Sequence, residues 1–456
     1  MARNKFDFDL IVIGSGAGGS SAATIAARDG KRVAIVETDT FGGTSPNWGD
    51  IPTKSLLHAA HLYDDVKSGG AFGLRASALG YNFLSIQAWK SNVLKKIGAG
   101  DSKRNFEADG VTTLHGQAHF LSPHEITVNR QTYSAENFLI ATGAHQAIPD
   151  ITGIGDIELT TYRSLLEAPR PPKSLFIIGG GHIALEISEL FAIFGTKVYI
   201  AEVAPHLLPA YDSEVGELIG PYFEKHKGMT VLTKTKVVAV EKENIAKRVI
   251  FNRGGQEHNV RVDEVLVAAG RLPNVDIGLD NAGVDYTAKG IKTNEFLQTT
   301  AKHIYAAGDV LGHNGYTHTA LLESRVAVNN ILSRHKYIPE YEATPRVIFT
   351  NPSIASVGLT EDDCIRRDLQ VRKATAPLSI IMRSNTSNFS DGFVKLITDK
   401  KGVLIGATIV APHAGEMIHE LALAIKYNLT ATQVASTPHA FLTWSEAIKA
   451  AANKLS

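Results

Sequence analysis

The sequence predicts an α/β protein that ends in an α+β domain, and three observations support this class. A strand, a glycine turn, a helix and a second strand open the chain. The same pattern returns after the proline-rich segment 169–172. Beyond about His335, alternating runs typical of antiparallel strands replace it. The 456 residues suffice for about three domains.

The first pattern is a complete strand–turn–helix–strand unit. Residues 9–14 form an apolar run typical of a buried parallel strand, residues 20–29 are compatible with a helix, and residues 33–37 form a second strand that ends in Glu37. The turn carries glycines at three spaced positions, Gly14, Gly16 and Gly19. Such glycines let the backbone approach a pyrophosphate at a helix N-terminus, and the strand-end acid accepts hydrogen bonds from ribose hydroxyls. The pattern predicts a Rossmann-like dinucleotide-binding domain.

The second pattern has the same order. Residues 174–178 and 197–202 are the predicted strands, residues 185–195 are the predicted helix, and Glu202 is the strand-end acid. The three motif positions of its turn hold Gly179, Gly181 and Ala184. One such motif is a weak signal, but two matched motifs in one chain are a strong one. We therefore expect two Rossmann-like domains.

Later segments complete the predicted fold. Residues 138–143 and 304–309 are predicted strands that return to the first domain. The C-terminal α+β domain is predicted to contain three strands and two helices, at residues 347–357, 393–398, 403–410, 416–427 and 443–451.

The second glycine turn also indicates which nucleotide it prefers. The carboxylate of Glu202 would meet a 2′-phosphate at close range, and like charges repel. No Arg or Lys stands between Glu202 and Asp212 to receive that phosphate. Ala184 points weakly the other way, because alanine at the third position is common in NADP sites. Repulsion between the Glu202 carboxylate and a 2′-phosphate is the stronger effect, so NADH is favoured over NADPH.

Charge and cysteine content exclude several classes. Lys plus Arg and Asp plus Glu each number 46, so no basic excess indicates a nucleic-acid partner. The single cysteine, Cys364, cannot form an intramolecular disulfide. Residues 1–9 are polar and lack the apolar core of a signal peptide, and no segment is a membrane span. A cytoplasmic protein is expected.

The chain resembles the class I pyridine nucleotide–disulfide oxidoreductases over essentially its whole length. That family includes dihydrolipoamide dehydrogenase, glutathione reductase and soluble transhydrogenase. The segments that carry the resemblance are Gly42-Gly-Thr44 with Pro52-Thr-Lys54, Ala141-Thr-Gly143, the second glycine motif with Glu186, Gly270-Arg-Leu-Pro-Asn274, Ala306-Ala-Gly-Asp309 and Ser445-Glu446. Together they form a highly specific set.

The resemblance implies two cofactors and a pair of catalytic residues. FAD is expected at the first glycine turn and the nicotinamide nucleotide at the second. Lys54 and Glu186 match the family's ion pair beside the flavin N5, and Asp309 matches the acid near the FAD ribityl and phosphate. The other implied cofactor contacts are Gly43, Thr44, Ala141, Thr142, Gly143, Gly270, Arg271, Gly308 and Ala320.

The resemblance also implies a domain division and an assembly. Residues 1–148 and 270–335 are expected to form the FAD-binding domain, residues 149–269 the NAD(P)-binding domain, and residues 336–456 the dimerisation domain. A homodimer is therefore expected.

The chain departs from the family where electrons leave the flavin. The family has a Cys-x4-Cys pair after Gly-Gly-Thr, and here those positions hold Ser45 and Asp50. Phe441 stands at the position of the acid–base histidine, five residues before Glu446, and it cannot transfer a proton. His439 matches a different position. The sequence predicts that hydride transfer from NAD(P)H to flavin is retained and that transfer from flavin to a disulfide is lost.

The predicted function is therefore an FAD-dependent NAD(P)H oxidoreductase that reduces a small non-disulfide acceptor such as a quinone. A soluble pyridine nucleotide transhydrogenase is an alternative, because residues 48–54 resemble that subfamily, although Glu202 disfavours the NADPH it needs. A non-catalytic flavin-binding protein is a second alternative, against which Lys54 and Glu186 argue. An oxidase that forms H₂O₂ is a third.

Overall fold

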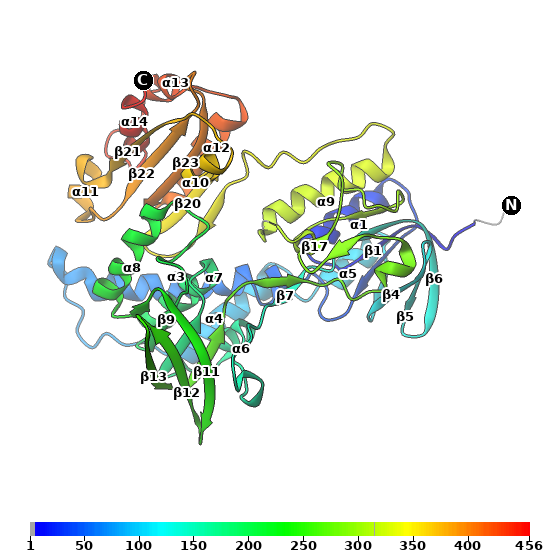
Figure 1. The fold of residues 1–456 in the computed structure, drawn as a ribbon, viewed down its shortest axis with the longest axis horizontal. Helices are drawn as coiled ribbons and strands as arrows, with labels where there is room; N and C mark the ends of the chain where they lie inside the picture. The colour runs from blue at the N-terminus through cyan, green and yellow to red at the C-terminus, as the bar shows by residue number, and fades with distance from the viewer. Residues whose placement is uncertain (1–4, 314) are drawn as a thin grey trace. The chain divides into compact units, whose positions relative to one another are not determined.

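The structure is a computed structural model that describes residues 5–313 and 315–456. The chain forms two compact units (Figure 1). The first unit contains Met1–Ser55, Ser85–Ala147 and Gly270–Pro339, and the second contains Leu56–Leu84, Ile148–Ala269 and Glu340–Ser456. The first unit overlaps largely with the expected FAD-binding domain, apart from Leu56–Leu84. The division of the chain into three domains stays a prediction.

A seven-stranded sheet forms the centre of the first unit. The path β3-β2-β1-β6-β5-β4 runs across it, and β18 pairs with β6. The pairs among β1, β2, β3, β6 and β18 are parallel, and β4, β5 and β6 pair antiparallel. The strands are β1 Phe8–Ile13, β2 Val33–Glu37, β3 Thr112–His115, β4 Ala118–Ser122, β5 Glu125–Val128, β6 Gln131–Ile140 and β18 Ile304–Ala306. The expected strand 138–143 overlaps the end of β6, the expected strand 304–309 contains the whole of β18, and both observed strands end three residues earlier than expected.

Small residues let two helices of this unit lie side by side (Figure 1). Helix α1 (Ala17–Arg28) buries Ala22, Ala23 and Ala26, and it packs on α9 (Thr317–Leu332). The Ala22 N–H donates to Ser324 Oγ of α9 at 3.1 Å. The remaining elements are α2 Thr44–Asn47, α5 Ser102–Ala108, β7 Ala144–Gln146, β15 Arg271–Pro273, η3 Leu279–Ala282, β16 Tyr286–Thr287, β17 Gly290–Ile291 and η4 Asp309–Leu311. Helices α3 (Asp50–Ser68) and α4 (Phe83–Lys96) contain residues of both units.

The second unit contains the second Rossmann-like sheet. Its four strands are parallel in the order β10-β9-β8-β14, and β11, β12 and β13 form an antiparallel sheet. The elements are η1 Gly69–Phe72, η2 Ile154–Asp156, α6 Tyr162–Glu167, β8 Ser174–Ile178, α7 His182–Ile193, β9 Lys197–Ala201, α8 Ser213–Lys227, β10 Thr230–Leu232, β11 Thr235–Glu243, β12 Ala246–Arg253, β13 Gln256–Val262 and β14 Glu264–Val267. The predicted strand–helix–strand order of this region is confirmed.

The C-terminal part has a five-stranded antiparallel sheet in the order β19-β20-β23-β22-β21. The elements are β19 Arg346–Ile348, β20 Ser353–Gly358, α10 Glu361–Arg366, β21 Arg372–Pro377, η5 Leu378–Ile380, α11 Met382–Ser387, β22 Phe393–Thr398, β23 Leu404–Ala411, α12 Ala414–Lys426, α13 Ala431–Ser436 and α14 Glu446–Asn453. The expected α/β class with an α+β end is confirmed. A single strand over 347–357 was wrong, because the chain turns at residues 349–352, where Pro352 lacks the N–H that a central strand needs.

No helix among the described residues is long and apolar enough to cross a membrane.

Candidate functional site

The first glycine turn is built by close approach between backbone segments. Gly14 has φ +105°, and a Cβ atom there would lie 2.1 Å from the carbonyl oxygen of Ala141. The carboxylate of Glu37 fixes the turn from the end of β2. Its Oε2 accepts from the N–H of Ser15 at 3.1 Å and from Ser15 Oγ at 2.6 Å, and its Oε1 accepts from the N–H of Asp39 at 3.0 Å. The predicted turn and its strand-end acid therefore form one hydrogen-bonded structure.

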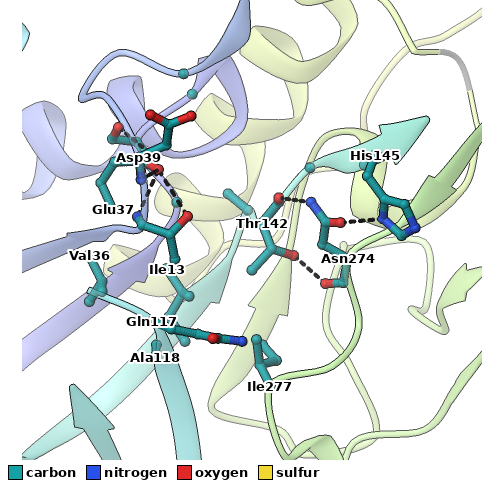
Figure 2. Close-up of a pocket in the computed structure, with 18 of the residues that line it drawn as sticks. Ile13, Val36, Glu37, Asp39, Gln117, Ala118, Thr142, His145, Asn274 and Ile277 are labelled. Atoms are coloured by element: carbon teal, nitrogen blue, oxygen red, sulfur yellow. Dashed lines mark hydrogen bonds between the residues drawn. The ribbon is translucent and has the colours of Figure 1, made fainter. Parts of the chain in front are cut away.

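This turn opens onto a cavity of about 610 Å³ within the first unit (Figure 2). The cavity is lined by eight of the predicted cofactor contacts, Gly14, Gly16, Glu37, Gly43, Thr44, Ala141, Thr142 and Gly143. Gly19 does not line it, because it lies in α1 against the turn itself. The structure thus brings together residues that the sequence places up to 129 positions apart.

Two side chains that the sequence did not single out also line this cavity. His145 Nδ1 donates to Asn274 Oδ1 at 2.6 Å, and Asn274 Nδ2 donates to the carbonyl oxygen of Thr142 at 2.8 Å (Figure 2). Gln117 enters from the segment between β3 and β4 and extends toward Ile277 in Figure 2. Asn274 belongs to a recognised segment, but His145 and Gln117 carry no sequence motif.

A second group of predicted contacts gathers at the end of β18. Arg271 Nη2 lies 3.5 Å from Asp309 Oδ2, and a Cβ atom on Gly308 would lie 3.4 Å from the Cβ of Ala320. The buried Glu323 accepts from the N–H of Gly308 at 2.7 Å and so holds the loop that carries Asp309. Glu323 could not be predicted from the sequence, because an acid inside a helix gives no local signal for a buried role.

The two non-cysteine positions belong to one hydrogen-bond network. Ser45 Oγ donates to Asp50 Oδ2 at 3.0 Å, and Thr317 Oγ1 donates to the same oxygen at 2.6 Å. Lys54 Nζ lies 3.2 Å from Asp50 Oδ1. Burial by itself would raise the pKa of Asp50, but the charge of Lys54 and the hydrogen bonds from Thr317, Lys54 and Ser45 hold that pKa below its ordinary value. Asp50 is therefore an anion at neutral pH.

The second glycine turn repeats the first. Gly179 has φ +111°, and Glu202 Oε2 accepts from the N–H of Gly180 at 2.7 Å while its Oε1 accepts from the N–H of Ala204 at 2.8 Å. Glu202 is buried. On α7, the buried Glu186 accepts from the N–H of Phe349 at 3.0 Å. Glu186 belongs to the second unit and Lys54 to the first, so their pairing stays a prediction.

The space around the second glycine of each motif indicates whether these turns suit a bound dinucleotide. Gly16 and Gly181 precede the first residues of α1 and α7. A Cβ atom at Gly181 would meet no described atom within 4 Å, and at Gly16 its nearest contact would be an ordinary 3.8 Å. The protein itself therefore has room for a methyl group at both positions. Glycine there leaves a helix start open to a molecule that lies across it, and helix N–H groups suit a pyrophosphate.

Two buried polar atoms also suit FAD in the first unit. Arg271 Nε and Thr319 Oγ1 are buried and have no hydrogen-bond partner among the described residues. Arg271 adjoins Asp309, and Thr319 precedes Ala320 on α9. Buried donors without partners are costly, and a bound cofactor with polar atoms satisfies them. When bound, FAD supplies the hydride and electron chemistry, and these residues would bind and orient it.

The C-terminal segment holds its histidine in a structural role. His439 Nε2 lies 2.9 Å from Glu420 Oε1, and His439 Nδ1 lies 2.9 Å from the carbonyl oxygen of Thr437, so both ring nitrogens are engaged. Phe441 is 73% exposed. Glu446 accepts from the N–H of Leu442 at 2.9 Å. Both His439 and Glu446 are therefore held in place by hydrogen bonds within the C-terminal part.

The single cysteine is a buried residue of the C-terminal part. Cys364 is buried in α10 of the second unit. Burial raises the pKa of its thiol, and the charges of Asp363 and Asp212 raise it further. A buried thiol with a raised pKa is a poor nucleophile.

Comparisons with known proteins agree with the geometry. The family model described as pyridine nucleotide-disulphide oxidoreductase matches residues 8–325, and the model of that family's dimerisation domain matches residues 344–452. The dimerisation domain supports a homodimer.

Relatives match over nearly the whole chain. Dihydrolipoyl dehydrogenase of Thermus scotoductus is 35% identical over 98% of this chain and 97% of its own, and mercuric reductase of Staphylococcus aureus is 34% identical over 98% of this chain and 82% of its own. The Cu(II) complex of the HOCl-induced flavoprotein disulfide reductase RclA of Escherichia coli has a TM-score of 0.85 and 26% identity, and the match covers 100% of both chains. The chain belongs to the pyridine nucleotide–disulphide oxidoreductase family and is, as a member of it, an FAD-dependent NAD(P)H oxidoreductase.

Proposed function

We propose that this protein oxidises NADH and passes the electrons from FAD directly to a small acceptor such as a quinone, with no redox-active disulfide between them. The observation that carries the proposal is the pair Ser45 and Asp50, which are hydrogen-bonded at 3.0 Å where the family has two cysteines. Neither side chain can be oxidised to a disulfide, and the only cysteine, Cys364, has no second thiol in the chain. The overall reaction balances as NADH, a proton and a quinone giving NAD⁺ and a hydroquinone.

In this proposal the two glycine turns have separate cofactors. FAD is bound by the first turn, by Glu37 and by Arg271 and Asp309. The nicotinamide nucleotide is bound by the second turn and Glu202. Lys54 and Glu186 are the proposed catalytic residues, which orient the reacting ends of the two cofactors. The further proposed FAD contacts are Gly43, Thr44, Ala141, Thr142, Gly143, Gly270, Gly308 and Ala320.

The fixed charge of Glu202 supports NADH as the donor. Its two oxygens accept from the backbone of Gly180 and Ala204, so the carboxylate cannot swing away from the glycine turn without breaking both hydrogen bonds. A 2′-phosphate in the ribose position would therefore meet a carboxylate that is held in place.

The C-terminal segment supports the absence of thiol exchange. Exchange with a disulfide substrate needs a base for the thiol proton, and such catalysis contributes about 10²- to 10⁴-fold. Phe441 has no titratable group, and both nitrogens of His439 are engaged.

The test is turnover with four acceptors: a benzoquinone, lipoamide, glutathione disulfide and an NAD⁺ analogue. We expect the wild type to reduce the quinone with NADH and to reduce neither disulfide. Ser45→Cys with Asp50→Cys should remain poor with disulfides, and adding Phe441→His should recover part of the deficit. Cys364→Ala is the control and should leave every rate unchanged.

Three outcomes would contradict the proposal. Steady disulfide turnover by the wild type would overturn the role given to Ser45 and Asp50. A double cysteine variant as active with disulfides as the triple variant would contradict the claim that Phe441 limits thiol exchange because it cannot act as a base. Hydride transfer from NADPH to the NAD⁺ analogue without quinone reduction would favour the transhydrogenase instead.

A further inference from the structure

The carboxylate of Asp50 lies where the N-termini of two long helices meet. Asp50 is the first residue of α3, and its partner Thr317 is the first residue of α9. Each helix N-terminus carries a partial positive charge from its peptide dipoles. Two hydroxyl groups and the ammonium of Lys54 complete the surroundings of the carboxylate. Every described neighbour that bonds to Asp50 therefore stabilises a negative charge at this point.

This charge is open on one side. The side chain of Asp50 is 49% exposed, whereas the buried carboxylate of Asp212 in the second unit is 1% exposed. Oδ2 is occupied by the two hydroxyl groups, and Oδ1 bonds only to Lys54 among the partners given by the structure. The segment just before Asp50 contributes Thr44 and Trp48 to the wall of the 610 Å³ cavity. Asp50 can therefore act electrostatically on a molecule beside it.

We propose that Asp50 determines which acceptors the enzyme reduces, because its fixed negative charge favours cationic planar acceptors over neutral ones and neutral ones over anionic ones. This inference rests on the proposed function, since it places the acceptor beside the Ser45–Asp50 pair. A cationic acceptor such as N-methylphenazinium takes one hydride equivalent from NADH, which gives NAD⁺ and the neutral dihydro compound. A neutral quinone takes the same hydride equivalent and one proton.

The partial exposure of the Asp50 carboxylate limits how strongly its charge can change the relative kcat/KM of different acceptors. A unit charge a few ångströms from a half-exposed carboxylate is screened by solvent and by salt. We therefore expect roughly a tenfold change in relative kcat/KM for each change of acceptor charge by one unit.

The experiment compares the wild type with Asp50→Asn on three acceptors: N-methylphenazinium, benzoquinone and a naphthoquinone sulfonate. Asp50→Asn keeps an oxygen for Ser45 and Thr317 but removes the charge. We expect the ratio of kcat/KM for the cation over the anion to fall by roughly a hundredfold at low salt, since these two acceptors differ by two units of charge, while the neutral quinone changes little. Asp65→Asn, an exposed position on the same helix, changes the net charge equally and should leave the ratio unaltered.

A second readout does not depend on turnover. Removing a negative charge near the flavin should shift its midpoint potential to more positive values, because the reduced form carries more negative charge. Asp50→Glu is the control that retains the charge, and it should keep both the wild-type acceptor preference and a potential near that of the wild type. If Asp50→Asn does not retain flavin, Asp50→Ala removes the charge in its place.

The outcomes separate the two proposals. If the neutral quinone is reduced but the charge preference and the potential are the same in Asp50→Asn as in the wild type, the role of Asp50 is wrong and the proposed function stands. If the wild type reduces none of the three acceptors with NADH, the proposed function fails, and the acceptor role of Asp50 fails with it, whatever the potential shows.

Discussion

The two glycine turns of this chain have similar backbone conformations, but they differ in the space that their helices leave at the third position of the motif. Gly14 and Gly179 have φ values of +105° and +111°, and a Cβ atom at either would collide with a neighbouring carbonyl oxygen, at 2.1 Å and 2.5 Å. In both turns the strand-end glutamate accepts N–H groups of the turn. The same local structure has therefore been built twice, once in each unit.

The difference lies at the third position of the motif. A Cβ atom at Gly19 would lie 2.0 Å from the carbonyl oxygen of Gly14 and 2.8 Å from Val12 Cγ1. At the corresponding place in the second turn, Ala184 is completely buried and its methyl group is accommodated. The residue type at the third motif position, glycine or alanine, thus depends on how closely the helix approaches its strand. Packing explains Ala184 without reference to a 2′-phosphate.

The largest effect is expected from exchanging the third residues. Gly19→Ala places a methyl group into backbone atoms that cannot move easily, so we expect a loss of about 3 kcal/mol of stability and early release of flavin on heating. The reverse change, Ala184→Gly, should cost only about 1 kcal/mol. Thermal unfolding followed by flavin fluorescence and circular dichroism measures both. Equal losses would mean that the two helices approach their strands equally closely.

Adding a methyl group at the middle positions should weaken ligands and spare the fold. We expect Gly16→Ala to purify with little flavin, and Gly181→Ala to keep its flavin but to bind NADH roughly tenfold more weakly, about 1.4 kcal/mol. Flavin content after purification and NADH titration under anaerobic conditions are the measurements. A large drop in the unfolding temperature of the flavin-free proteins would show instead that the protein needs these glycines for itself.

Exchanging the charge at the second turn should change the nucleotide preference. Glu202→Arg removes the repulsion and supplies a cation, so we expect the NADPH-to-NADH ratio of flavin reduction rates to rise roughly tenfold. Glu202→Gln is the control, since it removes the charge but keeps an oxygen for the N–H of Gly180. Stopped-flow bleaching of the flavin gives the rates. A wild type that prefers NADPH tenfold would contradict the argument.

The smallest effect concerns the residue after the first glycine. Ser15 donates its hydroxyl to Glu37 at 2.6 Å and accepts from the N–H of Gly42, whereas Gly180 offers only its backbone. Ser15→Gly copies the second turn into the first and should cost about 1 kcal/mol. Urea unfolding resolves a change of this size. No change would show that the backbone hydrogen bonds from Ser15, Thr38 and Asp39 are sufficient to hold Glu37.

Much of the fold could be predicted because it follows local periodicity. The elements of the two strand–turn–helix–strand units lie within a few residues of the predicted ranges, since apolar runs and glycine turns are local signals. The alternating pattern of the last domain also predicted antiparallel strands. The pattern did not predict the burial of Lys395. Its strand β22 is buried on both faces, and its ammonium contacts three carboxylates, Asp212, Glu214 and Glu361.

The sequence by itself determined the two glycine turns, their acids, the single cysteine and the replacement of a cysteine pair by Ser45 and Asp50. Each of these is a residue type at a fixed local spacing. Only the tertiary structure decided that Asp50 bonds to Thr317, 267 positions away, that His145 reaches Asn274 across 129 positions, and that His439 is bound to Glu420. Such contacts depend on sheet register and on the packing of helices, which bring distant side chains together without leaving a periodic signal in the chain.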